Sequence, residues 1–270
     1  MKKLLILGAG DVARRALPLL HDFTIDAPAR AEFDLDAPLF ERLPRDVDAL
    51  LYTVPPPNVG EVDVRMERLL AFWREHGGAP QHLVYISTSG VYGDCAGEWV
   101  DESRVLNAQS ARAVRRVDAE LQLRSFALAH DISLSVLRAP GIYAAERLPL
   151  QRIRDGVPIL HAVEDAFSNH IHADDLAAMC VAALRAPRGV EAYNACDDVP
   201  IKMGDWFCAL AQYAGLPPPP RVSRAELEAQ VSAMQWSFVR ESRRLSNHKI
   251  KRDLGVQLRY SSVLDFLLGL

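Results

Sequence analysis

The feature that most constrains the fold stands at the start of the chain, where an apolar run enters a glycine-rich turn. From Leu4 the sequence reads LLILGAGDVA, which places Gly-x-Gly-x-x-Ala between a buried strand and the beginning of a helix. In this pattern Gly8 permits a tight turn, Gly10 lets a phosphate approach the backbone, and the small third residue lets helix and strand pack closely. Asp11 and Val12 open the helix, whose first amides suit phosphate oxygens. The segment therefore predicts a dinucleotide-binding strand–turn–helix unit.

Apolar runs typical of buried parallel strands alternate with helical patterns along the first half of the chain. Strands are expected at residues 4–7, 49–53, 83–87 and 134–137, and helices at residues 11–20, 62–76 and 110–129. This alternation predicts an α/β protein with a Rossmann-type, doubly wound parallel sheet. Residues 20–34 are too few for a full helix and strand. We therefore expect a second strand near residues 23–25 whose following helix is absent or reduced to a turn, and a third strand before Asp34 and Asp36.

The alternation becomes irregular after Pro140. We expect residues 1–165 to form the NAD(P)-binding body, and residues 166–270 to complete the sheet and form a small substrate lobe. The stretch Pro217–Pro220 is expected to be a stiff connector, since consecutive prolines favour an extended conformation.

Composition narrows the class of protein. With 270 residues, of which 49% are hydrophobic, the chain can bury a large core, and its net charge of −4 makes nucleic acid an improbable partner. No run approaches the roughly 20 apolar residues of a membrane span. Four scattered cysteines suit reduced thiols, so a cytoplasmic location is expected. A basic cluster near the C-terminus is expected to be a solvated helical surface: Arg240, Arg243, Arg244, Lys249, Lys251 and Arg252.

The cofactor expected at the glycine turn is NAD or NADP, and the sequence leaves the choice open. Asp26 lies near the end of the second strand, where a carboxylate holds the ribose hydroxyls of NAD. Arg30 lies four residues later and suits the 2′-phosphate of NADP instead. Thr53 and Val54 end what we expect to be the fourth strand and are predicted to line the nicotinamide ribose, since the prolines after them have no amide to donate.

Further motifs follow the later strands. The chain reads STSGVYG from Ser87, SARAVRRVDAELQL from Ser110, LRAPGIY from Leu137 and HIHADDLA from His170. Together with the glycine turn, these blocks resemble the extended short-chain dehydrogenase/reductases, and most of all atypical YeeZ-type members described as NAD-dependent epimerase/dehydratase-like. The resemblance covers nearly the whole chain. It implies a nicotinamide dinucleotide cofactor, a small-molecule substrate that it does not identify, and a homodimer through the helices at residues 62–76 and 110–129.

The resemblance also implies site residues and exposes a gap. In that family the residue four positions before the motif tyrosine touches the substrate, which is Thr88 counted from Tyr92. The next helix of the family carries Tyr-x-x-x-Lys, often followed four residues later by Glu. Alignment on Glu120 places Arg112 at the tyrosine position and Arg116 at the lysine position. The chain has no lysine between residues 4 and 201, so no other alignment restores the pair.

The two arginines change the expected chemistry. A free phenol has a pKa of about 10 and needs a neighbouring cation to exchange protons at neutral pH, whereas a guanidinium stays protonated. Arg116 remains a candidate for holding cofactor ribose or phosphate. The simpler interpretation, which we favour, is that Arg112, Arg116 and Glu120 lie on a solvated helix face. The opposite, buried face would then carry Val114, Val117, Leu121 and Leu128.

Three residues are candidates for moving a proton in place of the missing tyrosine. They are Tyr92, Tyr143 and His172, although buried tyrosines more often serve packing. His170 and His172 share one strand face, as metal ligands can, but no third ligand has a clear spacing, so no metal is predicted.

Two classes of function fit these observations. The first is a NAD(P)-dependent oxidoreductase or sugar-nucleotide epimerase/dehydratase relative that lacks Tyr-x-x-x-Lys. The alternative is a catalytically silent NAD(P)-binding sensor or scaffold.

Overall fold

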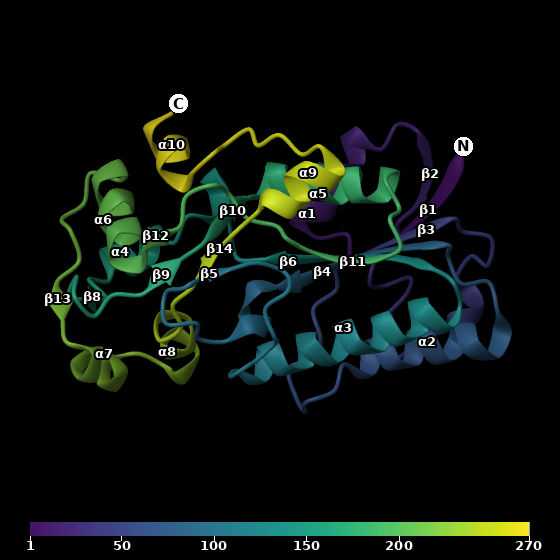
Figure 1. The fold of residues 1–270 in the computed structure, drawn as a ribbon, viewed down its shortest axis with the longest axis horizontal. Coiled ribbons are helices and arrows are strands. Elements are labelled where there is room, and N and C mark those ends of the chain that lie inside the picture. Colours follow the sequence, from purple (N-terminus) through teal and green to yellow (C-terminus); the bar gives the residue numbers. More distant parts are fainter. Residues whose placement is uncertain (270) are drawn as a thin grey trace.

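The computed structural model describes residues 1–269, apart from the side chain of Glu41, and is built around a six-stranded parallel sheet (Figure 1). The strand order is β11-β6-β4-β3-β1-β2. These strands are β1 Lys2–Leu7, β2 Phe23–Asp26, β3 Ala49–Tyr52, β4 His82–Thr88, β6 Ser133–Ala139 and β11 Val190–Asn194. Because all of them pair in parallel, their carboxyl ends meet at one edge of the sheet. The α/β prediction is confirmed.

Helices cover both faces of the sheet (Figure 1). One face packs on α1 Asp11–Ala16, α5 Ala173–Arg185 and α9 His248–Leu254, and the other on α2 Val64–His76 and α3 Ala111–Ala129. Leu4 and Ile6 of β1 point into the first layer, whereas Leu5 and Leu7 point into the second. Since successive strand residues point to opposite faces, only a continuous apolar run can fill both layers.

The second strand–helix unit is reduced, as the sequence predicts. Between β2 and β3 the described chain contains the 3₁₀ turn η2 Phe40–Arg42 and no other helix or strand. Phe33 and Leu35 are buried in the layer of α2 and α3, and the ring of Phe40 stacks on that of Phe72 at a centroid distance of 4.9 Å. The expected strand before Asp34 is therefore wrong, because loop side chains cover this part of the sheet, and Thr53 follows the third strand rather than a fourth.

A smaller lobe stands at the carboxyl edge of the sheet (Figure 1). Its paired strands are β5 Trp99–Val100 with β14 Arg244–Leu245, β7 Gly141–Tyr143 with β10 His170–His172, β8 Ile159–Leu160 with β13 Arg221–Val222, and β9 Phe167–Ser168 with β12 Ile201–Lys202. Its helices are α4 Leu150–Arg154, α6 Met203–Tyr213, α7 Arg224–Gln230, α8 Ala233–Val239 and α10 Val263–Leu268. Across the whole described chain, the 3₁₀ turns other than η2 are η1 Leu17–Leu19, which follows α1, η3 Ser89–Tyr92 and η4 Ala145–Arg147. The lobe core contains Tyr143, Ile153, Trp206 and Phe207, so it takes residues from both sides of position 165. The predicted proline connector lies between α6 and β13.

Candidate active site

The glycine turn joins β1 to α1 at the carboxyl edge of the sheet and packs against the end of β3. Gly8 has φ of +95°, and a Cβ atom there would lie 2.7 Å from Thr53 Oγ1 and 2.9 Å from the backbone nitrogen of Val54. The hydroxyl of Thr53 donates a hydrogen bond to the carbonyl oxygen of Gly8. Both the turn conformation and this contact therefore require glycine at position 8.

Gly10 differs from Gly8 in both respects. Its φ of −76° is open to any residue, and a Cβ atom there would have as its nearest neighbour the Gly8 carbonyl oxygen, at 4.0 Å. Neither the backbone conformation nor the packing of the described residues requires glycine at position 10. The described residues therefore leave room for a Cβ atom at position 10.

Ion pairs from three elements surround the mouth of this turn. Asp11 accepts hydrogen bonds from Arg15 Nε at 3.0 Å and from Nη1 of Arg147, on η4, at 3.1 Å. Arg15 also pairs with Glu146 of η4 and with Asp174 at the start of α5. Partial burial raises the pKa of Asp11, but the bonds from the two arginines outweigh this effect and hold the pKa below its ordinary value. The substrate lobe is thus tied to the glycine turn through charged side chains.

The two candidates for cofactor choice lie in different situations. Asp26 ends β2 opposite Leu5 of β1, and its exposed side chain forms no ion pair with the described residues. Arg30 is exposed and pairs with Asp34 at 3.2 Å and with Asp36 at 3.0 Å. Asp26 thus lies at the carboxyl end of β2, beside the strand that leads into the glycine turn, whereas Arg30 is already engaged with two carboxylates.

Thr88 ends β4 at the same edge of the sheet. Its side-chain oxygen accepts a hydrogen bond from the amide of Gly90 at 3.2 Å, and the residue is only partly buried. A hydroxyl can accept one bond and donate another, so this geometry leaves the proton of Thr88 available to a substrate oxygen. A Cβ atom at Gly90 would lie 3.5 Å from Cβ of Ala113, which shows that the start of α3 stands beside this segment.

The predicted orientation of α3 is wrong. Arg116 is partly buried and donates hydrogen bonds from Nη1 to the Tyr85 hydroxyl at 3.0 Å and to the Ile86 carbonyl at 2.7 Å, and Glu120 is buried. Leu121 and Leu128, expected in the core, are 56% and 62% exposed. The face that meets the sheet instead consists mainly of small residues and of charged residues with partners, namely Ala113, Arg115, Ala119, Glu120, Leu123, Phe126 and Ala127.

Beneath the STSGVYG segment lies a buried polar network. Glu120 accepts hydrogen bonds from the Ser87 hydroxyl and from Arg138, whose Nη2 lies 2.8 Å from Glu120 Oε2. Arg138 Nη1 also donates to the Tyr92 hydroxyl at 2.9 Å, which in turn donates to Asn194 Oδ1 at 2.8 Å. Burial raises the pKa of Tyr92 far above its ordinary value of 10. Tyr92, one of the candidates for proton transfer, therefore has the packing role that is more common for a buried tyrosine, because its hydroxyl is bonded inside the protein.

Arg112, at the position of the family tyrosine, points outward. Its guanidinium carbon lies 4.1 Å from the ring centroid of Phe238 on α8, which is 50% exposed. The end of α8 is also fixed to the start of α3, because Arg240 donates to the carbonyl of Gln109 at 3.1 Å. A stacked arginine thus takes the place of the phenol, and α8 lies against it.

The other two proton-transfer candidates lie together in the lobe. The Tyr143 ring is 5.2 Å from that of His172 and 5.3 Å from that of Phe266, and the hydroxyl has no hydrogen-bond partner among the described residues. Burial, and to a smaller extent the charge of Asp197, raises the pKa of Tyr143. Burial lowers the pKa of His172, whose Nδ1 accepts a hydrogen bond from the Asp174 amide at 3.1 Å. Both side chains are buried, with exposures of 3% for Tyr143 and 4% for His172.

A basic pocket of about 420 Å³, which the sequence does not reveal, opens on the lobe. Its four cations bond to backbone carbonyl oxygens, and none has a carboxylate within 4 Å among the described side chains; they are Lys202, Arg224, Arg240 and Arg244. The ring of Phe167 lies between two of them, 4.4 Å from Lys202 Nζ and 4.9 Å from the guanidinium carbon of Arg244. Asp94 and Asp165 also line the pocket, but their carboxylates accept bonds from backbone amides.

The basic pocket corrects the expectation for the C-terminal cluster. Arg240 and Arg244 line the pocket, and Arg243, on the other side of the same segment, pairs with the buried Glu241 at 2.8 Å. Only the later members, Lys249, Lys251 and Arg252, belong to a helix, α9.

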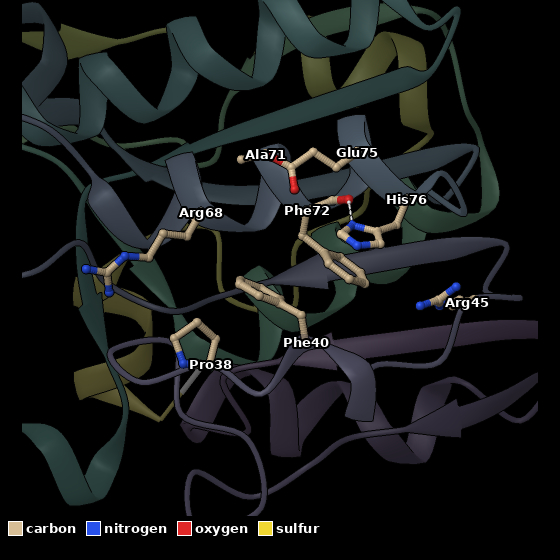
Figure 2. A pocket seen from close by; sticks show the side chains of 8 residues that line it. All are labelled: Pro38, Phe40, Arg45, Arg68, Ala71, Phe72, Glu75 and His76. Atoms are coloured by element: carbon tan, nitrogen blue, oxygen red, sulfur yellow. Dashed lines mark hydrogen bonds between the residues drawn. The ribbon is translucent and has the colours of Figure 1, made fainter.

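Another hollow, of about 440 Å³, lies along the outer side of α2 and does not adjoin the predicted site. Figure 2 shows the rings of Phe40 and Phe72 at its centre, with Arg45 and Arg68 at opposite ends. Its lining comes from α2 and from the loop that stands in place of a helix after β2. The hollow therefore forms where this loop packs against α2.

No group of three or more His, Cys, Asp and Glu side chains in residues 1–269 is arranged to hold a metal ion. In the same part of the chain, no helix has the length and apolar character needed to cross a bilayer.

The chain is similar to known proteins in both sequence and structure. Residues 61–196, half of the chain, match the model of the family described as NAD dependent epimerase/dehydratase. The matched segment includes Thr88, Arg112, Arg116, Tyr143 and His172, and begins after the glycine turn and the reduced β2 unit. No curated protein matches the chain.

Solved structures agree along the full length. A functionally unknown conserved protein from Silicibacter pomeroyi DSS is 29% identical, with 100% of this chain and 98% of that chain covered and a TM-score of 0.83. MoeE5 in complex with UDP-glucose and NAD is 18% identical, with 99% and 96% covered and a TM-score of 0.76. RMD from Pseudomonas aeruginosa, complexed with NADPH, is 15% identical over all of both chains, with a TM-score of 0.75. At the lower identities the likeness concerns the fold.

Proposed function

Because the chain belongs to the NAD dependent epimerase/dehydratase family, we propose that it binds NAD or NADP at the glycine turn and transfers hydride to or from a carbon atom of a small anionic substrate. The reaction class is that of an oxidoreductase or of an epimerase that oxidises and reduces in turn. The cytoplasm is the proposed location, in line with four cysteines that form no disulfide.

Gly10 is the observation that carries this proposal. Glycine costs conformational entropy, and here neither the turn nor the packing requires it. A group from outside the chain that comes within contact distance of the backbone accounts for its presence. In Gly-x-Gly-x-x-Gly/Ala turns, that group is the pyrophosphate of a dinucleotide.

The residues around the turn fit such a cofactor. The backbone of Gly10, Asp11 and Val12 would receive the pyrophosphate, and Asp26 would hold the adenosine ribose, which favours NAD. Val54 would border the nicotinamide side, next to Thr53, whose hydroxyl fixes the turn. When bound, the nicotinamide ring donates or accepts the hydride.

Thr88 is proposed to orient the substrate. Its oxygen already accepts the Gly90 amide bond, so its proton can be donated to a substrate hydroxyl or carbonyl oxygen. For proton transfer His172 is favoured over Tyr143, because burial lowers the pKa of the imidazole and so favours its neutral, basic form, whereas burial raises the pKa of the phenol and opposes its ionisation.

The basic pocket is proposed to bind the anionic part of the substrate. Four cations without carboxylate partners attract a phosphate or carboxylate, and the Phe167 ring between two of them suits a flat group. UDP-glucose, bound by the similar MoeE5, is one example of a molecule with this character.

The first experiment is calorimetric titration of the purified protein with NADH and with NADPH. We expect binding of at least one, preferably NADH, and a loss of at least about tenfold in affinity in Gly10→Ala with unchanged thermal stability. Absence of binding to either dinucleotide would refute the proposal.

The second candidate function, a silent dinucleotide sensor, is favoured by Arg116. Arg116 stands where the resemblance predicts the catalytic lysine, and its side chain is bonded to Tyr85 and Ile86 inside the protein instead of serving an acid–base pair. A panel of phosphorylated and nucleotide-linked sugars and carbonyl compounds, followed by NADH absorbance, separates the two functions. Turnover that falls about 100-fold in Thr88→Val supports the enzyme, whereas binding without turnover across the panel supports the sensor.

A homodimer through α2 and α3 is part of the proposal. The exposed Leu121 and Leu128 on the outer face of α3 support it. A monomer mass by light scattering would remove it.

A further inference from the structure

Asp11 places a carboxylate directly after Gly10, at the turn proposed to receive the cofactor. The pyrophosphate group of a dinucleotide is itself an anion, and like charges at close range repel. An aspartate at this position is therefore unfavourable for binding unless a cation neutralises it. Two cations do so, Arg15 and Arg147.

The two arginines are held very differently. Arg15 is on the same helix as Asp11 and also pairs with Glu146 and Asp174, so three carboxylates fix it in place. Arg147 comes from η4 and makes its side-chain hydrogen bond to Asp11, with no other such bond among the described residues. Its side chain is 41% exposed, against 22% for Arg15. Arg147 is thus the cation that can move.

We propose that Arg147 leaves Asp11 and binds the cofactor pyrophosphate when the dinucleotide arrives, while Arg15 keeps Asp11 neutralised. This inference rests on the proposed function. A guanidinium forms two parallel bonds with a phosphate group, whereas it makes a single bond to Asp11 here. The exchange therefore gains bonds.

Other arginines are less suited to this role. Arg259 pairs with Asp174 at 3.6 Å, at the start of α5, and not with Asp11. Arg116 points beneath α3 toward Ile86. Arg147 also lies at the start of the substrate lobe, so its movement would couple cofactor binding to the position of η4.

The test compares two substitutions that break the same ion pair. In Arg147→Ala the cation is lost, and NADH affinity should fall about tenfold. In Asp11→Asn the pair is also lost, but the cation remains and the repelling charge disappears, so affinity should rise about threefold. If the ion pair served only to stabilise the structure, both substitutions would change the NADH affinity in the same direction. Arg154→Ala, at an exposed position on α4, is the matched control and should stay within about twofold of the wild type.

A second readout isolates the pyrophosphate. ADP-ribose contains this group without nicotinamide, so Arg147→Ala should weaken it as much as NADH, whereas AMP, which lacks the pyrophosphate linkage, should bind both proteins equally. The affinity of the wild type for NADH should also decrease more steeply with added salt than that of Arg147→Ala. Equal affinity of wild type and Arg147→Ala, or weaker binding by Asp11→Asn, overturns this inference and leaves the proposed function intact. Failure of the wild type to bind NADH, NADPH and ADP-ribose overturns both.

Discussion

The glycine turn and the beginning of α3 lie at the same edge of the sheet, yet they have departed from the family pattern to very different degrees. At the turn, Gly8, Gly10 and the following helix keep the pattern, and Gly8 is required by its positive φ and by its contact with Thr53. At α3, both positions of the expected acid–base pair carry arginine, one stacked on Phe238 and one bonded beneath the helix. The difference teaches that a short glycine turn can keep its local sequence pattern while a neighbouring helix carries arginines where the resemblance predicts an acid–base pair. The turn depends on a few consecutive residues, whereas a tuned phenol depends on partners from several elements.

The largest expected effect concerns the network below α3. Glu120→Ala leaves Arg138 buried without its carboxylate, and we expect the free energy of unfolding to fall by about 3–5 kcal/mol. Urea denaturation measures this change. Glu98→Ala removes the partner of Arg104 in an exposed pair and, as a control, should cost less than about 1 kcal/mol. Similar costs for both would mean that the start of α3 is not anchored by this network.

The two glycines of the turn should separate stability from binding. Gly8→Ala forces an L-residue into φ of +95° and against Thr53, so we expect a loss of about 2–3 kcal/mol in the free energy of unfolding. Gly10→Ala should change it by less than about 0.5 kcal/mol. Denaturant titration of both variants provides the measurement. A Gly10→Ala protein as unstable as Gly8→Ala would remove the main support for a bound cofactor.

Acid should lower the free energy of unfolding through two buried histidines, one in the sheet and one in the lobe. Burial lowers the pKa of His82, in the sheet, and of His170, in the lobe, from 6.5 to about 4. Because the unfolded chain binds the proton more tightly, their stabilising contribution is complete above pH 6.5 and is lost as the pH falls toward 4. From pH 7 to pH 5 each should cost about 2 kcal/mol.

The buried carboxyl group of Asp197 acts in the opposite direction, since burial raises its pKa well above the ordinary value. The histidine effect is therefore read from the difference between wild type and His170→Asn, each unfolded at pH 7 and at pH 5. An equal loss of stability in both proteins would contradict the assignment to His170.

The smallest expected effect tests whether α3 has kept any contact with the cofactor. Arg116→Lys cannot reach both Tyr85 and Ile86 with the same geometry, so we expect a loss of about 1 kcal/mol in stability. Affinity for NADH, measured by fluorescence, should change by less than about twofold. A tenfold loss of NADH affinity would instead assign Arg116 to cofactor binding, and α3 would then share this role with the glycine turn.

The sequence predicted the parts of this molecule that local rules determine. The strand–turn–helix at Gly8 and the parallel sheet follow from residue order and from apolar runs long enough for both faces. The reduced unit after β2 followed from chain length alone, but its filling by Phe33 and Leu35 did not, because loop residues have no period to recognise.

The face of α3 and the basic pocket could not be predicted in this way. The sequence pattern predicts a buried face of Val and Leu, whereas the helix buries alanines together with Glu120, whose partner Arg138 lies on another element. The pocket collects side chains from several separate segments. One signal was present, the recurrence of Arg240, Ser242 and Arg244 at every second position, and all three line the pocket.

The basic pocket has a consequence for how quickly a substrate reaches the protein. The chain as a whole carries a net charge of −4 and slows the approach of anions, while four cations around one opening create a local field of the opposite sign. Field lines concentrated at such an opening guide an anion to it from solution. The association rate constant should therefore exceed that of a neutral analogue at low ionic strength, and the two should converge as salt shortens the reach of the field.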